Sequence, residues 1–248
     1  MCFDADSTPP VPPISGAAVS HNELVLEAPD GNRVAAFAAT PDEPKHAGIV
    51  VLPDVRGLYR FYEELALRFA ERGYPAIAID YFGRTAGSVK RDDDFEYMPH
   101  VDETTQAGIQ SDVAAAVAYL ASSSAVFTVG FCFGGRNSWL AAASGHGLAG
   151  AIGFYGRPGV GRDGSSGPTQ RAEEIAAPIL ALMGGDDPGI PQEDIDAWDQ
   201  ALDAAGVEHE VVVYPGAPHS FFDRKYEQFA AESEDAWNRA LAFIDRYS

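Results

Sequence analysis

A six-residue segment near the middle of the chain has the residue types and the spacing that covalent chemistry needs. Residues 130–135 read Gly-Phe-Cys-Phe-Gly-Gly and lie between a predicted strand and a predicted helix. Chance would produce this G-x-C-x-G-G pattern only about 0.002 times in a chain of this composition, so the segment calls for a physical reason. A sharp turn from strand to helix strains the central residue and projects its side chain from the sheet. Flanking glycines let neighbouring backbone pass close to such a turn.

The position of Cys132 at the start of a helix favours a reactive thiol. Unpaired backbone N–H groups and the positive end of the helix dipole both stabilise a thiolate there. The N–H group of Phe133 would point the same way and could stabilise an oxyanion. A buried structural cysteine is the commoner role of a lone free cysteine, but the glycine frame favours a nucleophile here.

A thiol nucleophile needs a base, and the base needs a group that orients it. His219 follows the last predicted strand, in Gly-Ala-Pro-His-Ser-Phe-Phe (216–222). The segment Gly-Gly-Asp-Asp-Pro (184–188) follows an earlier strand and supplies Asp186 and Asp187. One of these aspartates would orient the histidine, and the other would cap the next turn. The chain order of nucleophile, acid and histidine is the order that α/β-hydrolases use.

The other five histidines are weaker candidates for the base, and none has metal-ligand spacing with another His or Cys. His100 lies in a segment that could form a lid. Surface positions are predicted for His21, His46, His146 and His209. We therefore expect no metal site.

Runs of apolar and β-forming residues predict the elements that position these side chains. Six such runs alternate with helical spacing, which is typical of strands buried in a parallel sheet. They are residues 47–53, 75–81, 125–131, 148–155, 178–183 and 208–214. Two earlier runs, 23–28 and 33–40, flank Pro-Asp-Gly-Asn and predict a hairpin. The sequence therefore predicts an α/β fold with a mostly parallel central sheet, helices on both faces and an N-terminal antiparallel hairpin.

In sheets of this kind, ligands bind at the carboxyl ends of the strands, which is where the candidate segments lie. The regular alternation is interrupted at 82–105, a long loop or small lid, and at 156–173, a loop rich in Gly, Ser and Arg. The 248 residues fit one large domain, predicted at 23–248. A Pro-rich arm that contains Cys2 is predicted at 1–22.

Charge and hydropathy limit the classes of partner. The chain has 17 Lys and Arg against 37 Asp and Glu, which gives a formal net charge of −20. Such a surface argues against nucleic acid and anionic membranes as partners. No apolar run approaches the ~20 residues that span a bilayer, and the N-terminus lacks the basic region of a signal peptide. Two cysteines fit a reducing compartment, so a cytoplasmic location is predicted.

From about residue 45 onward, nearly the whole chain resembles the dienelactone hydrolases, which are cysteine-dependent members of the α/β-hydrolase superfamily. The most specific matching segment is G-F-C-F-G-G at 130–135. M-G-G-D-D (183–187) and P-H-S-F (218–221) are moderately specific, and L-P-D-V-R-G (52–57) and Y-F-G-R (81–84) add to them.

The resemblance implies roles for individual residues. Cys132 would be the nucleophile, Asp187 rather than Asp186 the orienting acid, and His219 the base. The backbone N–H groups of Val55 and Phe133 would bind the oxyanion. No metal or organic cofactor is implied.

Two arginines, Arg84 and Arg224, would hold a carboxylate of the substrate according to the resemblance. The chain departs from the family at two points. Asp54 stands where the family has a glutamate that is thought to influence ionisation of the thiol. The family's second arginine lies four residues after the histidine, where this chain has Asp223, and Arg224 follows one residue later.

These observations predict a hydrolase that cleaves a small carboxylic ester or lactone carrying a carboxylate, through a thioester intermediate. Phe82, Tyr155 and Phe221 suggest an aromatic-walled pocket, although each also fits a core position. One alternative is a carboxylesterase or thioesterase of broad specificity for neutral substrates. Another is a catalytically silent binding or regulatory protein on the same fold. The sequence makes no prediction of oligomeric state.

Overall fold

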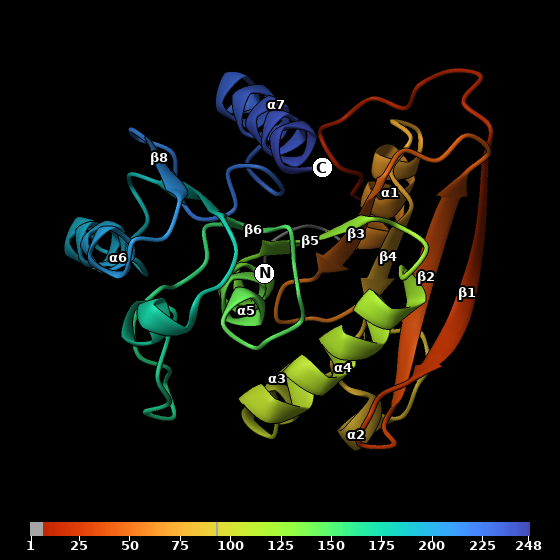
Figure 1. The fold of residues 1–248 in the computed structure, drawn as a ribbon, viewed down its shortest axis with the longest axis horizontal. Helices are drawn as coiled ribbons and strands as arrows, with labels where there is room; N and C mark the ends of the chain where they lie inside the picture. Colours follow the sequence, from red (N-terminus) through yellow and green to blue (C-terminus); the bar gives the residue numbers. More distant parts are fainter. Residues whose placement is uncertain (1–6, 93) are drawn as a thin grey trace.

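The computed structural model describes residues 7–92 and 94–248, and within them eight strands form one sheet in the order β1-β2-β4-β3-β5-β6-β7-β8 (Figure 1). Strand β1 pairs antiparallel with β2, and β2 pairs antiparallel with β4. The neighbours from β4 to β8 are all parallel. The predicted α/β class, with an N-terminal antiparallel hairpin, is therefore confirmed. The strands are β1 (Val19–Glu27), β2 (Arg33–Pro41), β3 (Ala47–Leu52), β4 (Ala76–Ile79), β5 (Ala125–Phe131), β6 (Gly150–Phe154), β7 (Ile179–Gly184) and β8 (His209–Tyr214).

Helices cover both faces of the sheet and create two separate hydrophobic cores. Helices α1 (Arg60–Ala70) and α7 (Ala230–Tyr247) cover one face. Helices α4 (Gln106–Tyr119), α5 (Phe133–Ala142) and α6 (Gln192–Ala205) cover the other face. Because both faces are covered, the central strands are buried along their whole length; every residue of β3 and β7 is buried.

Helix α6 shows how the sequence sets the bounds of an element. Its buried residues are Ile195, Trp198 and Leu202, which recur every three or four positions and so lie on one face. The helix ends at Gly206, whose φ of 69° is a left-handed conformation that glycine adopts without a steric penalty. The apolar spacing and the terminal glycine thus account for the bounds Gln192–Ala205.

The segment that interrupts the regular pattern holds two short helices, α2 (Gly83–Ala86) and α3 (Tyr97–Asp102). A buried ion pair anchors it, because Nη2 of Arg91 lies 2.7 Å from Oδ2 of Asp80 at the end of β4. The Phe95 ring stacks on His100 with centroids 5.1 Å apart. The segment is thus fixed against the carboxyl edge of the sheet, and its role as a lid stays a prediction.

The first strand begins earlier in the chain than the predicted run at 23–28. Strand β1 begins at Val19, so the last residues of the predicted arm belong to the sheet. Val11 is buried against the core under α1 and α7. Cys2 lies outside the described residues, and the division into arm and domain stays a prediction.

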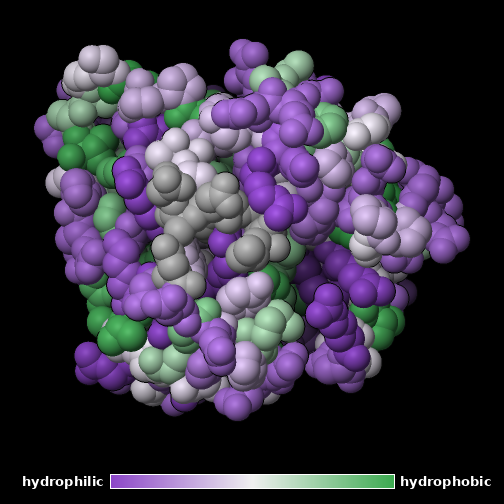
Figure 2. All heavy atoms as spheres, turned by 180° about the vertical axis from the view of Figure 1, so that it is seen from behind, coloured by the Kyte–Doolittle hydropathy of each residue, from purple (hydrophilic) through white to green (hydrophobic). Residues whose placement is uncertain are grey.

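The outer surface is strongly polar, as the net charge of −20 requires. Figure 2 shows hydrophilic side chains over most of one face, with hydrophobic ones scattered between them. In the ranges 7–92 and 94–248 no helix has both the length and the apolar character needed to cross a bilayer.

Candidate active site

The site is built around the turn between β5 and α5. Cys132 occupies the N-cap position of α5 with φ 56° and ψ −112°, a conformation that few non-glycine residues adopt. Its N–H group donates to the carbonyl of Phe154 at the end of β6, at 3.0 Å. The thiol is free and only partly buried. The strained strand-to-helix turn expected from the sequence is therefore present, with Cys132 at its apex.

Two glycines of the motif are required by close packing of the backbone. A Cβ atom on Gly130 would clash with the carbonyl of Gly134, one turn into the helix. A Cβ atom on Gly134 would clash with the carbonyl of Leu52 at the end of β3. The start of α5 therefore packs directly against β3, which brings Phe133 close to the loop that contains Val55. As the first residue of the helix, Phe133 has an N–H group without an intrahelical partner.

The predicted base and acid are in direct contact. Nδ1 of His219 lies 2.6 Å from Oδ2 of Asp187, which is buried. The other oxygen of Asp187 accepts the N–H group of Gly189 at 2.8 Å, which fixes the carboxylate. The neighbouring Asp186 is exposed. The geometry therefore pairs the histidine with the aspartate that the family resemblance selects.

The loop after β3 contains a buried acid beside a buried arginine. Oδ2 of Asp54 lies 3.5 Å from Nε of Arg56, and Oδ1 accepts the Arg56 N–H at 2.9 Å. The N–H group of Asp54 donates to the hydroxyl of Tyr62 at 3.0 Å. Val55, between the two charged residues, is half-buried. These contacts fix the loop that carries the Val55 N–H group.

A tyrosine links the histidine to another buried acid. The ring of Tyr155, the residue after β6, lies against the imidazole of His219 with centroids 5.0 Å apart. Its hydroxyl donates to Oδ2 of Asp223 at 2.8 Å. Burial raises the pKa of Asp223 to about 7, although hydrogen bonds from the Arg224 N–H and the Tyr155 hydroxyl oppose the shift.

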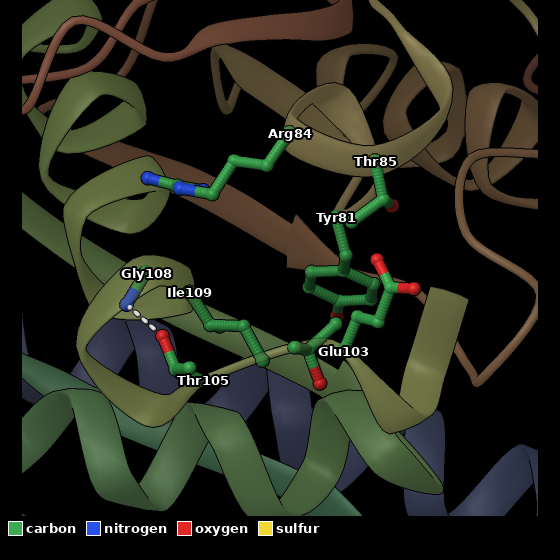
Figure 3. Close-up of a pocket in the computed structure, with 8 residues that line it drawn as sticks. Tyr81, Arg84, Thr85, Glu103, Thr105, Gly108 and Ile109 are labelled. Atoms are coloured by element: carbon green, nitrogen blue, oxygen red, sulfur yellow. Dashed lines mark hydrogen bonds between the residues drawn. The ribbon is translucent and has the colours of Figure 1, made fainter. Parts of the chain in front are cut away.

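The two arginines predicted to bind a carboxylate have different surroundings. The Arg84 guanidinium lies 2.6 Å from Asp112 and 2.5 Å from Asp30, so it already forms ion pairs with two carboxylates. In Figure 3 its side chain lines a small pocket with Tyr81 and points away from that ring. Arg224 is exposed on the turn that follows His219.

The three aromatic residues predicted to wall a pocket are all core residues here. Phe82, Tyr155 and Phe221 are fully buried. Phe82 packs between Tyr81 and Phe95, with ring centroids 6.2 Å and 5.5 Å away. Of the three, Tyr155 is the one whose ring lies against His219, as described above.

Away from this edge, one group of side chains could hold a metal ion. Ligand atoms of Asp199, Asp203 and His209 lie within 4.8 Å of one another. Spacing between His and Cys residues in the sequence does not reveal this group, because the fold brings α6 and β8 together to form it. His209 is also explained as a partner of Asp199, 3.2 Å away, and the expectation of no metal site stays a prediction.

The burial of Asp223 was also not predicted, because in the sequence this residue is only a departure from the family pattern. Nothing in the local sequence predicts that its carboxyl is buried or that it pairs with Tyr155, 68 positions earlier. The proximity of Asp223 to His219 in the sequence was the one available signal.

A sheet of this topology, with a strained residue between β5 and α5, an acid after β7 and a histidine after β8, defines an α/β-hydrolase. The dienelactone hydrolase family model matches residues 34–248. The chain therefore belongs to the dienelactone hydrolase family, a family of enzymes that hydrolyse esters or lactones.

Individual relatives agree with this assignment. The chain is 31% identical over 251 residues to a "Putative carboxymethylenebutenolidase" of Escherichia coli strain K12, covering 90% of this chain and 91% of the relative. It is 29% identical over 255 residues to a carboxymethylenebutenolidase of Rhodococcus opacus, covering 100% and 97%. The crystal structure of a "Putative Dienelactone Hydrolase" from Klebsiella pneumoniae superposes with a TM-score of 0.80 and 27% identity, covering 93% of this chain and 100% of that chain.

Proposed function

We propose that this protein hydrolyses a small carboxylic ester or lactone with Cys132 as nucleophile, His219 as base and Asp187 as the acid that orients the base. The observation that carries the proposal is the 2.6 Å contact between Nδ1 of His219 and a buried, hydrogen-bonded Asp187 carboxylate. This contact directs the other ring nitrogen, Nε2, away from the acid, as proton transfer requires. The strained turn at Cys132 supports the assignment of the nucleophile.

In the first half of the reaction, Nε2 of His219 takes the proton of the Cys132 thiol, and the sulfur attacks the carbonyl carbon. The tetrahedral oxyanion is bound by the N–H groups of Val55 and Phe133. Collapse of this intermediate breaks the bond to the alcohol oxygen, which takes the proton from the imidazolium. A thioester on Cys132 remains. With a lactone, the alcohol stays attached to the acyl group.

In the second half, His219 takes a proton from water, and the hydroxide attacks the thioester carbonyl. The second tetrahedral intermediate collapses, the thiolate leaves and regains its proton, and the carboxylic acid is released. Asp187 keeps the imidazole oriented throughout and stabilises its charged form. Asp54 forms an ion pair with Arg56, and its effect on ionisation of the thiol stays a prediction.

The mechanism is tested with Cys132→Ala, assayed on p-nitrophenyl butyrate. We expect kcat/KM to fall at least about 10³-fold, because removal of the nucleophile removes the covalent route. Cys2→Ser removes the other cysteine and is the matched control, which should keep full activity. Acid quenching followed by mass spectrometry should find the butyryl group on the peptide that contains Cys132. Turnover by Cys132→Ala at the control rate would contradict the proposal.

The charge of the substrate distinguishes two candidate functions. Hydrolysis of a carboxylate-bearing substrate needs a cation at the site, and Asp30 and Asp112 already occupy Arg84. Because these two ion pairs neutralise Arg84, they favour the alternative, an esterase for neutral substrates, unless Arg224 binds the carboxylate. The matched pair p-nitrophenyl valerate and mono-p-nitrophenyl glutarate differ in the terminal carboxylate.

If Arg224 binds a carboxylate, Arg224→Ala should lower kcat/KM for the glutarate about tenfold or more and leave the valerate within about threefold. The same measurement on Arg84→Ala shows whether that arginine contributes through its two ion pairs. Equal losses on both substrates would contradict a carboxylate clamp and support the neutral esterase.

A further inference from the structure

Two residues outside the triad contact each other next to the histidine. We propose that Tyr155 and Asp223 form a second positioning pair for His219, which holds the imidazole ring and favours its charged form while Asp187 fixes Nδ1. The inference rests on the proposed function of His219 as the base. It adds residues that the mechanism above does not use, and it can be tested separately from the identity of the nucleophile.

The position of Tyr155 is set by the strands that carry the nucleophile and the acid. Its N–H group donates to the carbonyl of Leu182 in β7 at 2.8 Å. The preceding residue, Phe154, accepts the N–H group of Cys132. Tyr155 itself has φ 39°, which is uncommon for an aromatic residue. Such a conformation persists only where the surroundings enforce it, and it turns the Tyr155 ring toward His219.

Asp223 is held on the same turn as the histidine. Its N–H group donates to the carbonyl of Ser220 at 3.3 Å, and the N–H group of Lys225 donates to the same carbonyl at 3.1 Å. Ser220 has φ 64°, so the turn immediately after His219 is tightly wound. The Tyr155 hydroxyl bonds to this turn through Asp223. The pair therefore connects the turn that carries the base to β6, beside the nucleophile.

The charges around Asp223 show what its carboxylate stabilises. Asp54, on the loop after β3, disfavours ionisation of Asp223 by repulsion, and a positive charge on His219 favours it. Hydrogen bonds from the Tyr155 hydroxyl and the Arg224 N–H also favour the carboxylate. An electrostatic interaction is reciprocal, so an ionised Asp223 favours the imidazolium that forms when the thiol loses its proton.

The burial of Asp223 supports a functional role. Its side chain is removed from water and, among the ion pairs of the described residues, none joins it to a Lys or Arg. A buried carboxyl without a cation is costly, and such groups concentrate at functional sites. The catalytic histidine is the neighbouring group that gains a positive charge during the reaction.

The test compares Tyr155→Phe and Asp223→Asn with wild type, measuring kcat, KM and the pH dependence of kcat on p-nitrophenyl butyrate. We expect kcat to fall about tenfold in each variant with KM within about threefold, because the pair acts on the base. The acidic limb of the profile should include one ionisation fewer in Asp223→Asn. In Tyr155→Phe it should move to higher pH, because the lost hydrogen bond favoured the carboxylate.

A matched pair of controls lies elsewhere in the fold. The hydroxyl of Tyr74, in the loop after α1, donates to Asp245 of α7 at 2.5 Å. Tyr74→Phe and Asp245→Asn make the same chemical changes and should leave kcat and the pH profile as in wild type. The positioning pair is overturned if Tyr155→Phe and Asp223→Asn behave like these controls while Cys132→Ala is inactive. Full turnover by Cys132→Ala would instead show that the proposed function has failed.

Discussion

Two aspartates at the carboxyl edge of the sheet are equally buried but differently surrounded. Asp80 accepts the N–H groups of Leu58 at 3.1 Å and Phe82 at 2.9 Å, and it forms an ion pair with Arg91 at 2.7 Å. Asp223 accepts one hydroxyl and one N–H group. Both side chains are at most 2% exposed.

The difference lies in how far the buried negative charge is compensated. The Asp80 carboxylate is compensated by a full positive charge, and its three partners come from the loop after β3, the start of α2 and the segment after α2. It therefore ties these segments together. The carboxyl of Asp223 has weaker compensation, so burial can raise its pKa to about 7. A group that changes its charge near neutral pH is better suited to a site of proton transfer than to a structural ion pair that connects segments.

The largest effect on stability is expected at the compensated acid. Asp80→Asn should lower the free energy of unfolding by about 3–5 kcal/mol at pH 7, because it leaves the Arg91 guanidinium buried without a counter-charge. Urea denaturation followed by circular dichroism measures this change. The double variant Asp80→Asn/Arg91→Met should recover part of the loss, since it removes the uncompensated charge. A loss below about 1 kcal/mol would mean that the ion pair with Arg91 does not distinguish the contribution of Asp80 to stability from that of Asp223.

A smaller effect of opposite sign is expected at the other acid. In the unfolded chain an aspartate titrates near pH 3.9, whereas burial raises the pKa of Asp223 in the folded protein to about 7. The folded state therefore keeps a proton that the unfolded state loses between these values, and stability falls as pH rises from about 4 to 7.

Asp223→Asn, which cannot ionise, should avoid this loss. We expect it to be more stable than wild type by roughly 2–4 kcal/mol at pH 8, with the difference disappearing below about pH 4. Urea denaturation at a series of pH values measures the gain. A difference between the two proteins that is constant from pH 4 to 8 would contradict the raised pKa. Asp245→Asn, at an exposed acid, controls for loss of one negative charge.

Features that follow from local sequence patterns could be predicted before the structure was known. Strand Ala125–Phe131 has the predicted bounds, because an apolar run and a glycine turn define it locally. The pairing of His219 with Asp187 likewise agrees with expectation, since both residues follow strands of one parallel sheet. The strand follows from a local pattern, and the pairing of residues 32 positions apart follows from the parallel sheet that such local patterns predict.

Features that depend on contacts between distant segments were not predictable in this way. The sequence predicts that Arg84 binds substrate, and nothing in it indicates that Asp30 in the hairpin turn and Asp112 in α4 form ion pairs with the same side chain. No local pattern shows that these three residues meet. The burial of Asp223, which depends on Tyr155 after β6, is hidden for the same reason.

The close approach of α5 to β3 also determines where this fold can change over evolutionary time. At Gly130 and Gly134 there is no space for a single added methyl group, because carbonyl oxygens already fill it. In the turn between β5 and α5, substitutions at these two glycines are therefore excluded, and the side chain at position 132 is the one that can vary. In the segments 82–105 and 156–173 the same restriction falls on separate glycines such as Gly83 and Gly167, whose added Cβ atoms would clash with the carbonyls of Arg33 and Gly159. New substrate preferences would therefore arise by remodelling the residues between such points, around the fixed position of Cys132.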